Sequence, residues 1–331
     1  MSLQPVYDDK VFQFSIASMS GAVFVTVIAF YLYNILFIFI IYINIYKRNH
    51  NTMTKITLDD FAVMTVSYQQ YSFDYVLNSI SEIGLKNIDF WGGIPHYYHF
   101  DYSDAQATAF LKELRKKAED KGLRFVIYTP ETLAYPYSIA DINPKTVQRT
   151  IDYFSLCMDD ALTLGTNRLF INTGTGLRDV DPKLSMDICI DTISRICKIA
   201  EEKGITMMLE QLQPYESNIC TDIHAIKKIV DSVNSKALKI CVDIVAMDVA
   251  KENLEMYYDY FGEDKIGFIH FSDSHHEVCG TGDLPLKEYI ETLERHNYSS
   301  IIDLEINDSI YWEDPHTPHK QTVDYLKTLL K

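Results

Sequence analysis

The chain has 331 residues, which is enough for one large α/β domain with a full hydrophobic core. Its formal net charge at pH 7 is −16, and a domain this acidic repels the phosphate backbone of nucleic acids, so a nucleic-acid partner is disfavoured. A neutral or cationic small molecule suits this charge better. The six cysteines form no CxxC pair and lie mostly in apolar runs, which indicates reduced thiols in the core.

The N-terminal segment differs in composition from the rest of the chain. Between Val11 and Tyr46 there is no Asp, Glu, Lys or Arg, and the part from Val23 to Tyr46 is almost wholly apolar. That part is longer than the roughly 20 residues that span a bilayer, so the segment predicts a transmembrane helix. Lys47 and Arg48 follow it directly, which would place the C-terminal domain on the cytoplasmic side of the membrane.

Met53 offers a second interpretation, because it is a plausible true start of the protein. Residues 1–52 would then be upstream sequence that is not translated, and the protein would be cytoplasmic. Both interpretations stay open, and a membrane is an expected partner only if residues 11–46 are translated. In either case the sequence divides into a hydrophobic segment at 1–52, which is a transmembrane helix or untranslated, and a catalytic TIM-barrel domain at 53–331. A homo-oligomer stays open.

After Met53 the chain alternates apolar runs with amphipathic helical stretches. One helix is expected to begin after Ser103 and another after Asp181, because both residues are good N-caps. Gly122 and Gly204 are expected to end these helices, since glycine adopts the left-handed conformation of a C-cap. A short apolar run follows each glycine at once, so the pattern indicates consecutive helix–strand units.

Eight apolar runs are predicted as strands, and a helical stretch follows each of them. They are residues 60–66, 86–90, 123–129, 168–172, 205–210, 238–243, 266–271 and 300–306. Eight βα units in one domain predict a (β/α)8 TIM barrel, preceded by the N-terminal hydrophobic segment. A doubly wound open sheet is the alternative, but it would need fewer strands and usually a Gly-rich first turn, which is missing here.

The last four predicted strands each end on a side chain that can bind a metal ion. These side chains are Glu210, Asp243, His270 and Glu305. Catalytic groups of TIM barrels lie at the carboxyl ends of the strands, and neighbouring strands are about 4.8 Å apart, so the four can converge on one ion. One imidazole and three carboxylates suit a single divalent ion such as Mn²⁺, Co²⁺, Mg²⁺ or Fe²⁺.

The chain resembles the xylose-isomerase-like TIM-barrel superfamily of sugar isomerases and epimerases, and within it the ketosamine 3-epimerases. The likeness runs from about Met53 to the C-terminus and includes no part of residues 1–52. The residues that carry it are Trp91 to His96, Tyr128 to Thr132, Tyr135-Pro136-Tyr137, Leu209-Glu210, Pro214 to Asn218 and Val242-Asp243-Ile244. The resemblance implies the same four metal ligands, and it implies that Glu216, six residues past the first of them, binds substrate.

Two positions depart from the pattern of some ketose epimerases in this superfamily. Ala246 stands where they have a histidine, and His276 stands where they have an arginine in the loop after strand seven. These differences leave specificity for a free ketohexose open, and the resemblance implies a ketosamine of the fructoselysine type as substrate. The expected substrate-binding residues are Glu216, His276, Trp91, His96 and Tyr135.

The expected reaction is epimerisation at C3 of the sugar. It requires removal of a proton beside a ketone and return of a proton on the other face of a planar enediolate. Glu210 and Glu305 come from strands that are not neighbours, so they can flank such an intermediate as two acid/base groups. A simple aldose–ketose isomerase needs only one base, so the pair favours an epimerase.

Several other functions stay open from the sequence. A ketose 3-epimerase or an aldose–ketose isomerase would act on a free sugar, and an inosose-type dehydratase would use the same metal to eliminate water. A repair endonuclease would need more histidine ligands and a basic groove, which the charge opposes. A non-catalytic, membrane-tethered sugar sensor is suggested only by residues 11–46.

Overall fold

The computed structural model describes residues 32–36, 54–132 and 136–331. The chain divides into two compact units, Met1–Met53 and Thr54–Lys331. In the first unit residues 32–36 are helical, and most of the predicted transmembrane segment at 11–46 lies outside the described residues. Within the described part of the chain, no helix is both long enough and apolar enough to cross a bilayer.

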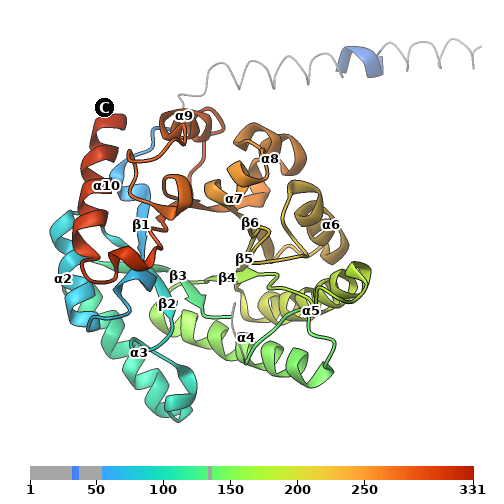
Figure 1. Ribbon diagram of the computed structural model, residues 1–331, viewed down its shortest axis with the longest axis horizontal. Helices are drawn as coiled ribbons and strands as arrows, with labels where there is room; N and C mark the ends of the chain where they lie inside the picture. Colours follow the sequence, from blue (N-terminus) through green and yellow to red (C-terminus); the bar gives the residue numbers. More distant parts are fainter. Residues whose placement is uncertain (1–31, 37–53, 133–135) are drawn as a thin grey trace, which may run out of the picture. The chain divides into compact units, whose positions relative to one another are not determined.

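The second unit is a closed barrel of eight parallel strands, in which each strand pairs with the next and β8 pairs with β1 (Figure 1). The strands are β1 Phe61–Met64, β2 Asn87–Gly92, β3 Arg124–Pro130, β4 Arg168–Asn172, β5 Thr206–Glu210, β6 Leu238–Asp243, β7 Ile266–Phe271 and β8 Ile301–Leu304. The prediction of a TIM barrel is therefore confirmed.

Helices surround the strands and form the outer layer of the barrel (Figure 1). They are α2 Phe73–Ile83, α3 Asp104–Glu119, α4 Pro144–Leu164, α5 Pro182–Lys203, α6 Ile223–Val233, α7 Ile244–Val249, α8 Leu254–Phe261, α9 Leu286–Arg295 and α10 His316–Leu329.

Three of the four caps predicted for α3 and α5 are found, and Gly122 is not the C-cap of α3, which is Asp120. Asp181 caps α5 by accepting from the N–H of Lys183, and Gly204 ends that helix with a φ of 72°. Ser103 begins α3 in a capping box with Gln106. The helix α3 ends at Glu119, slightly before Gly122.

The interior of the barrel changes character along the strands. Its middle layer is apolar, and it contains Met208, Cys241, Phe268 and Ile301. Two residues further along the same strands come Glu210, Asp243, His270 and Asp303. Since side chains alternate between the two faces of a strand, these polar groups lie on the same inner face, one layer nearer the carboxyl ends. The apolar layer thus closes the barrel beneath a polar end.

Candidate active site

The four predicted metal ligands lie together at the carboxyl ends of the last four strands. Glu210 ends β5, Asp243 ends β6, His270 is the penultimate residue of β7, and Glu305 directly follows β8. All four side chains are buried. The register pairs Asp243 with His270, which places both groups at the same height in the barrel.

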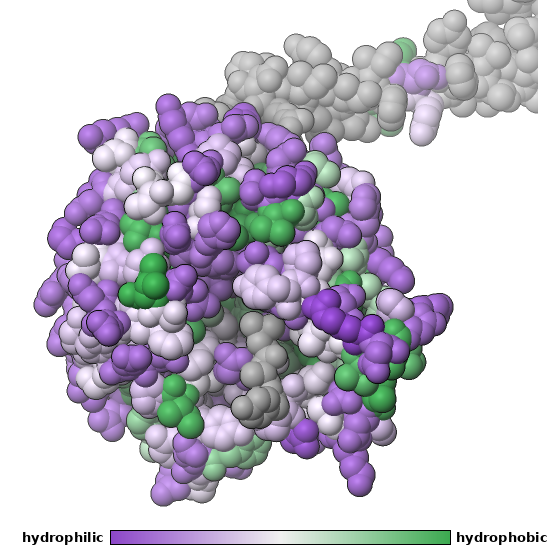
Figure 2. Space-filling view, viewed as in Figure 1, coloured by the Kyte–Doolittle hydropathy of each residue, from purple (hydrophilic) through white to green (hydrophobic). Residues whose placement is uncertain are grey.

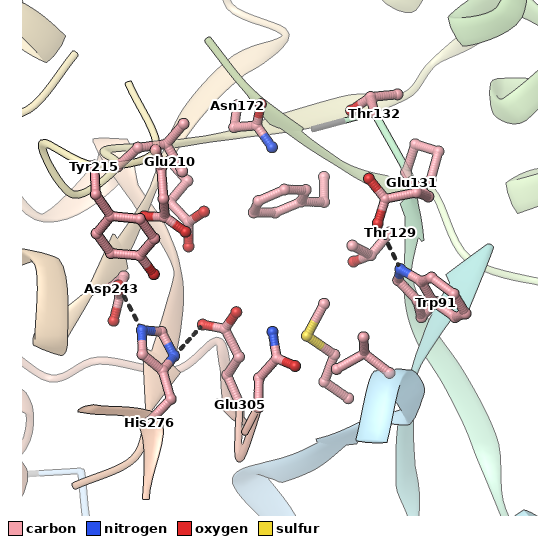
Figure 3. A pocket seen from close by; sticks show the side chains of 17 residues that line it. Trp91, Thr129, Glu131, Thr132, Asn172, Glu210, Tyr215, Asp243, His276 and Glu305 are labelled. Atoms are coloured by element: carbon pink, nitrogen blue, oxygen red, sulfur yellow. Dashed lines mark hydrogen bonds and ion pairs between the residues drawn. The ribbon is translucent and has the colours of Figure 1, made fainter. Parts of the chain in front are cut away.

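His270 is at the centre of this group. Its Nδ1 lies 2.5 Å from Oε1 of Glu210 and 3.0 Å from Oε2 of Glu305. Asp243 joins the group through His276, whose Nε2 is 3.7 Å from Oδ2 of Asp243 and whose Nδ1 is 3.4 Å from Oε2 of Glu305 (Figure 3). The structure thus gives two separate groups whose ligand atoms lie within 4.8 Å of one another: Glu210 with Cys241 and His270, and Asp243 with His276 and Glu305. The oxygen-rich donors are of the kind that divalent ions accept.

The carboxylate of Asp243 is fixed by the helix that begins beside it. Asp243 is the N-cap of α7, and its oxygens accept from the N–H of Val245 at 2.8 Å and of Ala246 at 3.1 Å. A helix N-terminus favours a negative charge, so this arrangement orients the carboxylate at little cost. The short side chain of Ala246 is buried here.

The loop after β7 turns His276 into the site. Both His275 and His276 adopt left-handed conformations, with φ of 61° and 60°, which is uncommon for residues other than glycine. The carbonyl of His276 accepts from the N–H of Asn307. The buried carboxylate of Asp273 holds the loop by accepting from the backbone N–H groups of Ser274, Gly280 and Leu284.

The charges in the site move the pKa values of the two candidate acid/base groups apart. Burial raises the pKa of Glu210 to about 8. Burial acts in the same direction on Glu305, but the charges of His270 and His276 outweigh it and lower the pKa of that carboxyl. Burial opposes a charge on His276, yet Glu305 and Asp243 raise its pKa to about 10. A divalent cation among these carboxylates would favour the ionised form of each.

A pocket opens above these residues, and Figure 2 shows a hollow near the middle of a mostly hydrophilic face. Its lining includes Met64, Val66, Trp91, Thr129, Glu131, Phe170 and Asn172 from the first four strands and their loops. In Figure 3, Trp91 and Glu131 lie across the pocket from Asp243 and Tyr215, and Nε1 of Trp91 donates to Oε2 of Glu131 at 3.2 Å.

The lining of the pocket is acidic. It contains the five carboxylates Glu131, Glu210, Glu216, Asp243 and Glu305. Oε2 of Glu216 accepts from the N–H of Gln213 at 2.9 Å, and burial raises the pKa of the carboxyl. Among the residues that the structure describes, no Lys or Arg lines the pocket. Among the described residues, the lining thus carries five carboxylates and one imidazole, that of His276.

The predicted substrate-binding residues fall into three groups. Glu216, His276 and Trp91 line the pocket. The structure does not bring His96 there: its Nε2 lies 3.1 Å from the carbonyl of Tyr71, and its ring packs edge-on against Phe73. A turn after β2, closed by the bond from His96 N–H to the carbonyl of Gly93, directs the side chain away. Tyr135 lies outside the described residues.

Sequence reasoning missed several polar residues of the site. Glu131 and Tyr215 line the pocket, and Asp89 and Asp303 lie buried beside His270. Strand alternation was a usable signal for Asp303, which is two residues before Glu305 and so faces the same side of β8. Glu131 lies just past β3 in a loop, where alternation gives no direction.

Residues 77–329 match the model of a protein family described as the xylose isomerase-like TIM barrel. The chain belongs to this family. Its sequence is 26% identical over 273 residues to fructoselysine 3-epimerase of Escherichia coli O157:H7, covering 81% of this chain and 97% of that protein. It is also 26% identical over 197 residues to D-psicose 3-epimerase of Enterocloster bolteae, covering 57% of this chain and 63% of that protein.

A solved structure of L-ribulose 3-epimerase has the same fold, with a TM-score of 0.70 at 16% identity, covering 84% of this chain and 95% of that chain. The relatives named here are thus sugar epimerases, and the solved one has the barrel fold of this chain.

Proposed function

We propose that the protein is a metal-dependent 3-epimerase that acts on a ketosamine of the fructoselysine and psicoselysine type. The observation that carries the proposal is the convergence of Glu210, Asp243, His270 and Glu305 at one end of the barrel. It is supported by the similarity to a fructoselysine 3-epimerase over 97% of that protein's length.

One divalent ion, such as Mn²⁺, Co²⁺, Mg²⁺ or Fe²⁺, is proposed to bind these four side chains. Three carboxylates and one imidazole are the donors that such ions accept. When bound, the ion would supply a Lewis acid that stabilises negative charge developing on substrate oxygens. Asp243 and His270 serve this site only as ligands, because neither is proposed to exchange a proton with the substrate.

Glu210 and Glu305 are proposed to carry the proton transfers. One carboxylate takes the proton from C3, which leaves a planar enediolate, and the other gives a proton to C3 from the opposite face. The two groups approach the same nitrogen of His270 from β5 and from the end of β8, so they border the pocket from different strands. No net oxidation or loss of atoms occurs, since one proton leaves and one returns.

The acidic pocket supports an amine-bearing substrate over a neutral or phosphorylated one. A divalent ion would balance part of the charge of Glu210, Asp243 and Glu305, while Glu131 and Glu216 add two more carboxylates to the lining. A phosphorylated sugar would meet repulsion there, whereas the ammonium groups of a ketosamine would be attracted.

A 3-epimerase of free ketoses is the second candidate, favoured by the similarity to D-psicose 3-epimerase. An aldose–ketose isomerase or an inosose-type dehydratase would use the same ligands but give different products. A nuclease is disfavoured because the described lining of the pocket contains no Lys or Arg to contact phosphates.

The test is incubation of the protein with Mn²⁺ and either fructoselysine or free ketoses in D₂O, followed by NMR. We expect deuterium at C3, formation of the C3 epimer, and a higher kcat/KM for fructoselysine than for fructose, tagatose or psicose. Loss of water from the substrate would instead identify a dehydratase, and deuterium at C1 would identify an isomerase. A higher kcat/KM for a free ketose would refute the ketosamine proposal.

Residues 1–52 are proposed to be dispensable for catalysis, because the eight βα units lie within Thr54–Lys331. A protein that starts at Met53 should have the same kcat/KM as the full chain in detergent. An inactive shortened protein beside an active full chain would contradict this. Intact-mass measurement of the native protein distinguishes a membrane anchor from a start at Met53. A mass that corresponds to a start at Met53 would support the proposal of a cytoplasmic protein.

A further inference from the structure

Two buried aspartates lie inside the barrel beside His270, and the proposed reaction does not use them. Asp89 is in β2 and Asp303 is in β8, and both side chains are fully buried. One oxygen from each, together with a ring nitrogen of His270, lie within 4.8 Å of one another. Asp303 is the register partner of His270 across the β7–β8 pair, so the two side chains are neighbours on the inner face.

The two aspartates differ in how they are held. Asp89 accepts from the hydroxyl of Thr129, which lies 2.7 Å and 2.9 Å from its two oxygens. An oxygen of Asp303 lies within 4.8 Å of an oxygen of Asp89. Among the described residues, neither oxygen of Asp303 receives a hydrogen bond. Burying a carboxylate without donors is costly, so a donor for Asp303 is to be expected in the working protein.

His270 also has a buried polar atom without a hydrogen-bond partner among the described residues. Its Nδ1 faces Glu210 and Glu305, while its Nε2 has no hydrogen-bond partner among the residues that the structure describes. The ring is completely buried, so bulk solvent does not reach that nitrogen. Cys241 also lies near the ring, but a thiol is only a weak acceptor. The carboxylate of Asp303 is the stronger acceptor for an Nε2–H group.

We propose that Asp303, backed by Asp89 and Thr129, is a positioning residue that accepts a hydrogen bond from Nε2 of His270. This bond keeps the proton on Nε2 and so leaves Nδ1 free to bind the metal. Histidines that bind metals generally donate their other N–H to such an acceptor, which fixes the tautomer and the orientation of the ring. The inference rests on the proposed metal site, since it concerns how one of its ligands is held.

The position of Asp303 argues against a purely structural role. The layer beneath it is apolar, and a residue such as Leu in its place would extend that layer without an unsatisfied charge. A structural role therefore predicts that Leu is tolerated or stabilising with no effect on metal binding. A positioning role predicts instead that the Leu variant keeps the fold but binds the metal more weakly.

The experiment measures Mn²⁺ affinity of the full-length protein by competition with a chelator, together with the melting temperature without metal. We expect Asp303→Leu to bind Mn²⁺ about 10- to 100-fold more weakly than wild type, with a melting temperature that is equal or higher. Asp303→Asn keeps an acceptor without its charge, so its loss should be smaller. Thr129→Val removes only the hydrogen bond that the hydroxyl donates to Asp89, so it should have the smallest effect.

Asp160→Asn is the matched control. Asp160 is another buried aspartate that pairs with a histidine, at 2.9 Å from Nδ1 of His99, but in α4 and outside the pocket lining. It should cost stability and leave Mn²⁺ affinity unchanged. The EPR spectrum of bound Mn²⁺ should change in the Asp303 variants and not in this control.

The possible failures are distinguishable. If wild type binds no metal, the proposed metal-dependent function is wrong, and the positioning role of Asp303 is wrong with it. If wild type binds one Mn²⁺ and Asp303→Leu binds it equally tightly, the positioning role is wrong. If wild type binds two Mn²⁺ per chain and the Asp303 variants lose one, the aspartates hold a second cation and the proposal is also overturned.

Discussion

The two halves of the barrel end in different chemistry. At the ends of β5 to β8 stand three carboxylates and an imidazole, held by ion pairs and by the N-terminus of α7. At the ends of β1 to β4 the lining is a buried apolar cluster of Met64, Val66 and Trp91, with Phe170, neutral polar groups and the single carboxylate of Glu131 beside it. One half therefore offers ligands and proton carriers, and the other offers a wall against which a substrate can pack.

The two halves are also held in place differently. Asp243 is fixed by backbone donors and His270 by neighbouring charges. Trp91 is held by packing and by the hydrogen bond that its backbone N–H donates to the hydroxyl of Thr65. Substitutions in the second half should therefore change metal affinity and kcat. Substitutions in the first half should change KM and the choice of substrate.

The largest effect is expected from Glu305→Gln in the second half. Gln keeps the size of the side chain but cannot act as a base, so kcat should fall by about 10²- to 10⁴-fold. Glu210→Gln should have a similar effect. If the two carboxylates serve opposite faces, each variant should retain exchange of the C3 proton with D₂O for only one of the two epimers. NMR of each epimer measures this.

Glu119→Gln, on the exposed surface of α3, is the control and should leave kcat unchanged. Near-normal turnover in either Glu210→Gln or Glu305→Gln would contradict the two-base scheme. Equal exchange of both epimers in one variant would indicate that a single group serves both faces.

Removal of the metal should affect the two halves unequally. At a free metal concentration of about 100 Kd, binding should stabilise the fold by about 2.7 kcal/mol. Hydrogen exchange should report this as slower exchange with Mn²⁺ than with chelator in the segments after β5 to β8, including α7. The segments after β1 to β4 should change little beyond the global effect. Equal protection in both halves would contradict the assignment of the ligands to one half.

This division was partly visible in the sequence. Three strands, β4, β6 and β7, have the bounds that the apolar runs predict. The four ligands are proposed from their places at strand ends. The reason is that buried parallel strands are apolar along their whole length, so a charged residue at the end stands out. The closed topology then brings four consecutive ends together.

The first half could not be predicted as well, because its site residues lie in loops. The direction of a loop side chain depends on turns that apolar patterning does not encode. His96 shows this. It is only five residues after Trp91, which lines the pocket, but the turn between them directs its side chain away. Glu131 shows the converse, since it lines the pocket without having been expected there.

The smallest effect, and the one most specific to the first half, is expected from Glu131→Gln. The carboxylate of Glu131 lies across the pocket from the proposed metal ligands, beside the ring of Trp91 (Figure 3). A sugar whose C3 is held near Glu210 and Glu305 would extend its amine-bearing chain away from them. We therefore expect Glu131 to attract the ammonium group of a ketosamine, and we expect a loss of about 10-fold in kcat/KM for fructoselysine in the variant.

Glu131→Gln should have nearly unchanged kcat/KM for free psicose, because that sugar has no ammonium group. The Mn²⁺ affinity of this variant should equal that of wild type. Trp91→Phe is the comparison: it keeps an aromatic wall but removes the N–H that donates to Glu131, so it should shift the preference in the same direction but less. Equal losses for fructoselysine and psicose in Glu131→Gln would mean that the carboxylate shapes the pocket without recognising the amine. In that case the two halves would differ in chemistry but not in their contribution to substrate selection.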